Sequence, residues 1–357
     1  MTSSAAPAGP RTALRDRVIR GGKRAVAQAM HTTGLLAVHR RRALHQRAVV
    51  LAYHRLLPAG ADTWSHPGII VTPEAFERHM RLLRQEFRVL TLQEFEHHFS
   101  TSTPFAPGSC LVTFDDGWLD TYTEAWPILQ RWQIPAAVFL PTHFIGSQET
   151  FWQEHLGLLL YEAGRILAGE PDFRGPLAET LRPCGLEHLI GELSAGRSTI
   201  IERVRTLKLD RVVAPAEAAA RIAALLGHRA PRPRDLFMTW DHVREMARGG
   251  VRFGAHGHTH RILSRLTQDE VSTELTSARA IIERETGTPV TSVSYPNGGW
   301  SDRVAACVGA LGFRVAFSME RGHAAATDPF FAIRRMNIHE GLSGSNALFR
   351  ARLQGVF

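Results

Sequence analysis

Short runs of apolar residues, alternating with longer amphipathic segments, are the feature that most constrains the fold of this chain. Three such runs lie at 48–53, 110–114 and 136–140, and nearly every position in them is apolar. Strands that are apolar on both faces are typical of parallel sheets covered by helices, whereas antiparallel strands usually alternate apolar with polar residues. The sequence therefore predicts a parallel α/β sheet or barrel.

The alternation stops after the third run and later resumes. Residues 147–236 are rich in Ala, Leu, Glu and Arg at helical spacing and contain no convincing strand. Further strands are predicted at 251–255, 291–295, 313–317 and 333–338, and helices at 72–87, 122–132, 241–248, 268–285 and 302–311. We therefore expect a barrel formed by residues 48–146 and 237–357, with residues 147–236 as a helical insertion.

The net charge of +8 is concentrated in the first 47 residues. This arm holds ten basic side chains and one acidic one, Asp16, so its charge is +9 and that of the remainder is −1. A basic arm can bind anionic lipid headgroups or nucleic acid. Because the remainder carries no nucleic-acid motif, we expect no nucleic-acid partner and peripheral contact with anionic membranes through residues 11–47.

Residues 12–26 of the arm have helical spacing, with Leu14, Val18, Ile19 and Val26 near one face. Such a helix lies either on the inner membrane surface or against the folded domain.

The sequence argues against a membrane-spanning helix, against a secretory signal and against a scaffold held together by cysteines. No apolar run approaches the roughly 20 residues that a membrane-spanning helix needs. The arm lacks the apolar core and small-residue cleavage site of a secretory signal, so we expect a cytoplasmic protein, peripheral at the inner membrane face. The three cysteines, Cys110, Cys184 and Cys307, lie far apart without a CxxC, which predicts neither a cysteine zinc cage nor a disulfide scaffold.

A pair of carboxylates directly follows the second predicted strand. Asp115 and Asp116 are adjacent, so a positive charge must compensate them or one of them must be protonated. Taken alone, the segment is more typical of a surface turn, because Asp and Gly are good turn formers.

A histidine cluster, His256, His258 and His260, follows the strand at 251–255. His256 and His260 share one face whether the segment is helical or extended, and His258 joins them only if the segment is extended. Neutral imidazoles in such pairs are common metal ligands, although an exposed polar loop is the alternative.

The two clusters are more informative together than apart. In a parallel barrel both would lie at the carboxyl rim, where barrel enzymes carry their active sites. Two histidines and one carboxylate can hold a divalent cation with a coordination position left open, and an adjacent carboxylate can act as a base toward water. The same ligands also describe the iron site of an oxygenase. The second carboxylate favours hydrolysis, because an oxygenase needs no base beside its ligand.

These motifs resemble those of the polysaccharide deacetylases, the carbohydrate esterase family that includes chitooligosaccharide and peptidoglycan deacetylases. The matching segments are TFDDG at 113–117 and HGHTH at 256–260, extended by YHR at 53–55, TWD at 239–241 and SYPNG at 294–298. The resemblance covers about residues 48–145 and 235–340. It implies a distorted (β/α) barrel with fewer strands than the regular eightfold form, with the helical insertion and the basic arm added to it.

The resemblance also implies an activity and the residues that carry it. The expected reaction is hydrolysis of N-acetyl or O-acetyl groups on a glycan containing N-acetylhexosamine, with release of acetate. For a cytoplasmic enzyme, a lipid-linked glycan precursor is the substrate within reach. By resemblance, Asp115 is the general base, and Asp116, His256 and His260 bind a divalent metal, for which we expect zinc (Zn2+).

Other roles implied by the resemblance concern the leaving group and the oxyanion. The backbone N–H of Asn297 is expected to help hold the oxyanion. His339 is the best candidate for the family's late histidine, a general acid, and His54 and His323 are weaker candidates.

The sequence also departs from the family pattern. Gly257 stands where the family has Ser or Thr, so a hydrogen bond that orders the loop is expected to be missing, and Arg261 replaces a Pro. No arginine stands in the third motif to orient the base, since Ser292 and Val293 occupy that stretch. A non-catalytic carbohydrate-binding relic is a further alternative, against which the intact Asp and His motifs argue.

Overall fold

The computed structural model describes residues 10–208, 214–231 and 236–357, with the backbone alone for residues 10–20. The chain divides into two compact units. The first comprises Met1–Pro58, Gly68–Ile145 and Met238–Phe357, and the second comprises Ala59–Pro67 and Gly146–Phe237. Each unit is described below by itself.

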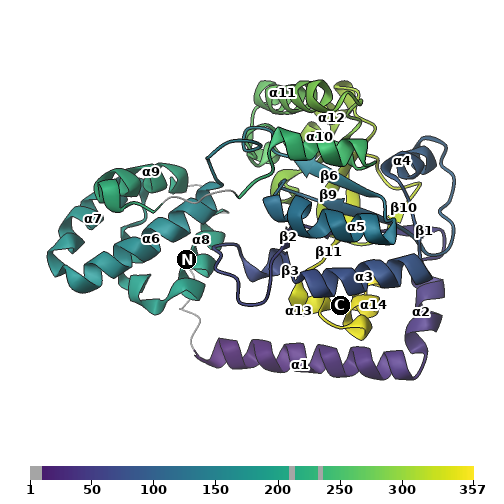
Figure 1. The fold of residues 1–357 in the computed structure, drawn as a ribbon, viewed down its shortest axis with the longest axis horizontal. Coiled ribbons are helices and arrows are strands. Elements are labelled where there is room, and N and C mark those ends of the chain that lie inside the picture. Colours follow the sequence, from purple (N-terminus) through teal and green to yellow (C-terminus); the bar gives the residue numbers. More distant parts are fainter. Residues whose placement is uncertain (1–9, 209–213, 232–235) are drawn as a thin grey trace. The chain divides into compact units, whose positions relative to one another are not determined.

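The first unit is built around a closed barrel of seven parallel strands. Figure 1 shows the helices of this unit around its central strands. In order around the barrel, these are β1 (Arg47–Tyr53), β11 (Ile333–Asn337), β9 (Val315–Arg321), β8 (Ser292–Ser294), β7 (Arg252–Ala255), β6 (Ala136–Leu140) and β5 (Ser109–Phe114). Pairing of β1 with β5, from Val49↔Cys110 to Tyr53↔Phe114, closes the ring. The expected barrel with fewer than eight strands is thereby confirmed.

Short strands flank the barrel, and the sequence did not predict them. They are β10 (Ala324–Ala325), antiparallel to β1, and β4 (Arg88–Val89), parallel to β5, with β2 (Arg55–Leu56) and β3 (Ile70–Val71) as a separate pair. Two-residue strands carry too little periodicity to be seen in a sequence.

Helices surround the barrel and bury the outward side chains of its strands. Those that contribute to this core are α3 (Pro73–Glu86), α5 (Trp126–Trp132), α10 (Trp240–Arg248), α11 (Gln268–Thr286), α12 (Asp302–Ala310) and α14 (Asn346–Leu353). α4 (Leu92–Ser100) and the short α13 (Glu340–Ser343) complete the unit. Threonines define several helix starts: Thr91, Thr239 and Thr267 form capping boxes, and Thr72 accepts from the Ala75 N–H.

The barrel interior changes character along its axis. Successive side chains on a strand face opposite ways, so alternate residues line the interior. Toward the amino ends these are apolar, as with Val50, Phe139 and Phe317, and α4 adds Phe95 to the same cluster. Toward the carboxyl ends they are polar yet fully buried: Thr113, Ser294 and Arg335. The polar half lies beneath the rim that carries the two motifs.

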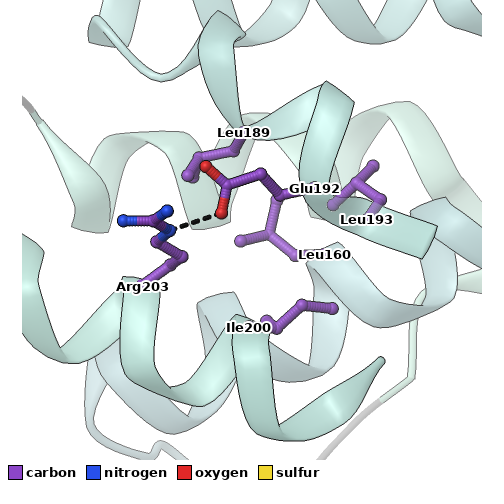
Figure 2. A pocket seen from close by; sticks show the side chains of 6 residues that line it. All are labelled: Leu160, Leu189, Glu192, Leu193, Ile200 and Arg203. Carbon is purple, nitrogen blue, oxygen red and sulfur yellow. Dashed lines mark hydrogen bonds and ion pairs between the residues drawn. The ribbon is translucent and has the colours of Figure 1, made fainter. Parts of the chain in front are cut away.

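The second unit is helical and has its own core. Its helices are α6 (Trp152–Gly169), α7 (Arg174–Leu181), α8 (Arg197–Leu207) and α9 (Pro215–Leu226). Figure 2 shows part of this core, where Arg203 binds Glu192 beside Leu160, Leu189, Leu193 and Ile200. Trp64, from the earlier segment 59–67, packs against the same core, with its ring centroid 5.3 Å from that of Tyr161. Sequence periodicity did not reveal this contribution.

The N-terminal arm forms two helices, α1 (Pro10–Thr32) and α2 (Leu35–Ala43). Ala27 and Leu36 are buried against α14, whereas Val26, Leu35 and Val38 are exposed by 49%, 54% and 56%. The expected apolar face of residues 12–26 depends largely on Leu14, Val18 and Ile19, whose side chains lie outside the described part of the chain. None of the described helices is both long and apolar enough to span a bilayer.

Candidate active site

Both motifs lie at the carboxyl rim of the barrel, on strands that are near neighbours. Asp115 follows β5, and its N–H donates to the carbonyl oxygen of Tyr53 at 3.0 Å. His256 follows β7, and its N–H donates to the carbonyl oxygen of Leu140, the last residue of β6, at 3.0 Å. The parallel strands therefore bring Asp115 and His256, 141 positions apart, to one edge, as the sequence predicted.

Asp116, His256 and His260 form a cluster whose potential ligand atoms all lie within 4.8 Å of one another. The Oδ1 atom of Asp116 lies 3.4 Å from Nε2 of His256 and 3.3 Å from Nε2 of His260. His258 is not in this cluster, because its Nδ1 lies 2.8 Å from the hydroxyl of Thr142.

The surroundings of this cluster fit a divalent cation. Nδ1–H of His256 donates to the carbonyl oxygen of Ser294 at 2.7 Å, which leaves the lone pair of Nε2 facing Asp116. Nε1–H of Trp118 donates to Oδ2 of Asp116 at 2.9 Å, which leaves Oδ1 toward the histidines. Two imidazole nitrogens and one carboxylate oxygen are the donors of many catalytic zinc sites.

A second layer of contacts holds the Asp116 loop. The guanidinium of Arg55 lies 4.2 Å from the centroid of the Trp118 ring, and its Nε donates to Asp120 at 2.9 Å. Asp120 also accepts from the N–H of Leu56 at 2.6 Å. The YHR segment thus fixes the indole that in turn orients Asp116, a role that the resemblance did not assign to it.

Asp115 is paired with a fully buried arginine. Arg335, on β11, donates from its two terminal nitrogens to the two carboxylate oxygens of Asp115, at 2.9 and 2.7 Å. The hydroxyl of Ser294 donates to Asp115 at 3.0 Å. Burial alone would raise the pKa of Asp115. The positive charges of Arg335 and the nearby His256 have the larger, opposite effect and lower the pKa to about 2. Asp115 is therefore an anion at neutral pH.

Arg335 supplies the positive charge that we expected from the sequence beside the adjacent carboxylates of Asp115 and Asp116. The orienting arginine that is missing from the third motif comes instead from β11, the strand that precedes His339. The period-two alternation of a strand could have revealed it, because one of Arg334 and Arg335 must face the barrel interior.

The histidine loop was expected to lack a hydrogen bond that orders it. This expectation was wrong, because Glu274 of α11 supplies such bonds. Its carboxylate accepts from the backbone N–H groups of His258 at 2.7 Å and Thr259 at 2.8 Å, and from the hydroxyl of Thr259. Gly257 has φ +74°, and a Cβ there would lie 3.0 Å from Glu274. Glycine is favoured at this position by both constraints.

The remaining predicted residues lie in different places. His54 follows β1, with its Nε2 3.9 Å from Oδ2 of Asp115. Its buried Nδ1 has no hydrogen-bond partner among the described residues, and burial lowers its pKa. His339 follows β11, and Asn297 lies in the exposed turn after β8 in a left-handed conformation, φ 54°. His323 lies elsewhere: its Nε2–H donates to the carbonyl oxygen of Leu353.

Comparison with known proteins agrees with this geometry. The family model of the polysaccharide deacetylases matches residues 215–316, which contain His256 and His260 but neither Asp115 nor Asp116. A Bacillus subtilis protein named "Putative polysaccharide deacetylase YxkH" is 18% identical over 297 residues, covering 83% of this chain and 73% of that protein.

Solved structures share the fold at low sequence identity. The Streptococcus pyogenes deacetylase PplD, in complex with acetate, has a TM-score of 0.54 at 16% identity, covering 85% of this chain and 97% of that one. IcaB from Ammonifex degensii has a TM-score of 0.54 at 17% identity, covering 86% and 97%. The resemblance to polysaccharide deacetylases is confirmed, and these findings together support a carbohydrate deacetylase.

Trp118→Phe tests the second layer of the cation site. Loss of the indole N–H frees Oδ2 of Asp116, so cation affinity should fall about 10- to 100-fold with little change in stability. Titration of Zn2+ into the metal-free protein measures it. Trp132→Phe, which removes an indole outside the site, is the control. Equal affinities in both variants would contradict the role of Trp118.

Arg335→Met tests the buried ion pair. It leaves the Asp115 carboxylate buried without its partner, so the free energy of unfolding of the metal-free protein should fall by about 3–5 kcal/mol. Denaturant titration at neutral pH measures this change. Asp115→Asn added to Arg335→Met removes the unpaired charge and should restore much of the loss. A strictly additive double variant would show that the two side chains do not interact.

Proposed function

We propose that this relative of the polysaccharide deacetylases is a metal-dependent hydrolase that removes acetyl groups from N-acetylhexosamine residues of a glycan and releases acetate. The observation that carries the proposal is that two separate groups of residues lie at one rim of the barrel. Asp116, His256 and His260 form a ligand set, and beside it Asp115 is held by Arg335 in a position where it is not a member of that set. A site for metal binding alone would not need the second carboxylate.

Each residue at the rim has a distinct part in the proposed reaction. A divalent cation held by Asp116, His256 and His260 would polarise the acetyl carbonyl and make water more acidic there. Asp115, ionised at neutral pH, accepts the proton of the attacking water. Its pKa is low, so this transfer would depend on the acidity that a bound cation would give the water. Arg335 and Ser294 fix the carboxylate. The backbone N–H of Asn297 helps hold the oxyanion.

The leaving amine requires a proton, and we assign its delivery to His339. Two features support this assignment: the resemblance, and its place two residues after the carboxyl end of β11. His54 is a second candidate, because its Nε2 lies 3.9 Å from Asp115 and its buried Nδ1 has no partner in the described part of the chain.

We further propose a lipid-linked glycan precursor as the substrate, met at the inner membrane surface by a cytoplasmic enzyme. The +9 charge of the arm supports this, since each basic residue near an anionic surface contributes about 1 kcal/mol at best. The exposed apolar side chains of Val26, Leu35 and Val38 lie on the helices of the same arm and can contact the membrane interface.

Acetate release from a panel of acetylated sugars tests the function itself. The panel contains free N-acetylhexosamine oligomers, polymers and lipid-linked sugars, each assayed with and without a chelator. We expect chelator-sensitive acetate release, fastest from the lipid-linked sugar. Release only from extracellular polymer would contradict the proposed substrate, and no release from any member would contradict the deacetylase.

Asp115→Asn and Asp116→Asn separate the base from the ligand. Asp115→Asn should retain the cation but lose about 10²- to 10⁴-fold in kcat, because an amide cannot accept the water proton. Asp116→Asn should weaken the cation itself, as should His256→Ala. Metal analysis and acetate release on the same samples measure both. Equal metal loss in the two Asn variants would refute this division of roles.

His339→Gln and His54→Gln identify the proton donor. We expect His339→Gln to lower kcat by about 10²- to 10⁴-fold with the metal content unchanged. His54→Gln should have the smaller effect. The reverse order, measured as acetate release per bound cation, would transfer the role of donor to His54.

A further inference from the structure

A strongly basic cavity lies on the outer side of the barrel, and none of its lining residues belongs to the ligand set or to the pair of Asp115 and Arg335. It has a volume of about 630 Å³, within the range of small-molecule sites. Segments far apart in the sequence form it: α2 and the turn after it, the β9–β10 turn, β11, and the end of the chain after α14. Its basic lining residues are His39, Arg42, His45, Arg47, Arg321, His323 and Arg334.

The charge of this cavity is poorly neutralised. No Asp or Glu lines it. Among the ion pairs of the described residues, Arg334 reaches Glu320 at 3.8 Å, and both side chains are about half exposed. Arg42 and Arg47 have no carboxylate partner in the described ranges, and Arg321 donates to a backbone oxygen, that of Gly355. Guanidinium groups that line one cavity repel one another, so an anion between them lowers the electrostatic energy.

His323 also lines this cavity. Its Nε2–H donates to the carbonyl oxygen of Leu353 at 2.8 Å. Burial lowers its pKa, and the nearby Arg47, His39 and Arg321 lower it further. The imidazole therefore stays neutral among the arginines, which leaves the positive charge on groups whose donors suit an oxyanion.

The cavity is distinct from the candidate active site, although one strand serves both. Arg335 of β11 points into the barrel, where it holds Asp115. Its neighbours Arg334 and Met336 line the cavity instead, because successive strand residues face opposite sides. The catalytic role proposed for the rim thus accounts for none of the cavity's arginines.

We propose that this cavity binds a phosphate group. Arginine forks match the tetrahedral oxyanion with paired, charge-assisted hydrogen bonds. The exposed Leu35 and Val38 lie four residues before the lining His39 and Arg42 on α2, so apolar surface adjoins the cavity on one helix face. A lipid headgroup or a soluble phosphate can supply the same chemistry. The inference does not depend on the deacetylase activity.

Two double variants of the full-length chain test the proposal. Arg42→Gln with Arg47→Gln removes two charges from the cavity. Arg24→Gln with Arg41→Gln removes two from the same helical arm without changing a lining residue. Calorimetry with inorganic pyrophosphate should show affinity at least about tenfold weaker in the cavity variant, and the control close to the unaltered protein. Acetate release from a soluble oligomer should be the same in both, which separates this site from the rim.

Flotation with phosphatidylcholine vesicles, with and without phosphatidic acid, shows whether the bound phosphate group belongs to a lipid or to a soluble compound. Loss of binding to phosphatidic acid vesicles in the cavity variant alone indicates a lipid headgroup. Selective loss of pyrophosphate binding, with unchanged flotation, indicates a soluble phosphate compound. Equal losses in both double variants would show diffuse attraction by the arm and overturn the proposal. An unaltered protein that binds neither pyrophosphate nor these vesicles would overturn it as well.

Discussion

The ion pair between Arg335 and Asp115 is the interaction on which the organisation of the barrel depends. Both side chains are withdrawn from water, and such burial is tolerated only when the charges are paired and their remaining donors are satisfied. Arg335 also donates to the carbonyl oxygen of Ser318 and the hydroxyls of Thr113 and Ser294. The carboxyl half of the interior is therefore polar because one arginine occupies it. An apolar core there would leave the guanidinium without partners.

The pair also explains how two adjacent carboxylates come to have different partners. Asp115 turns inward to the arginine, and Asp116 turns to the histidines. The change of direction occurs at Asp116 itself, which has φ 76°, and His260 has a comparable φ of 60°. Left-handed conformations of residues other than glycine are costly and cluster at functional sites. Here the bond from the Trp118 indole to Asp116 and the bond from the His256 ring to the carbonyl oxygen of Ser294 hold the strained loops in place.

The sequence predicted the barrel strands and both motifs because these are local signals. Apolar runs mark parallel strands, and the order of the strands brings Asp116, His256 and His260 to one rim. The partners that orient these residues were not predicted. Arg335 and Glu274 act across elements far apart in the sequence, and only the fold brings them to the site. One signal was available for Arg335, since two adjacent arginines cannot both face outward from a buried strand.

Other differences have the same physical origin. Residues 59–67 belong with the helical unit through Trp64, a single aromatic contact that carries no periodicity. The arm is basic by composition, but the fold gives its arginines different surroundings. Arg40 pairs with Glu86, whereas Arg42 and Arg47 line a cavity. Net charge alone does not distinguish a solvated tail from a built anion site.

The central claim is that one bound cation and one orienting ion pair make the rim catalytic. Its most direct test is to titrate Zn2+ into metal-free protein and follow acetate release from an N-acetylhexosamine oligomer on the same samples. The account predicts that activity rises in proportion to bound cation and stops at one equivalent. Full activity in the presence of a chelator, or activity that does not follow occupancy of the site, would contradict it.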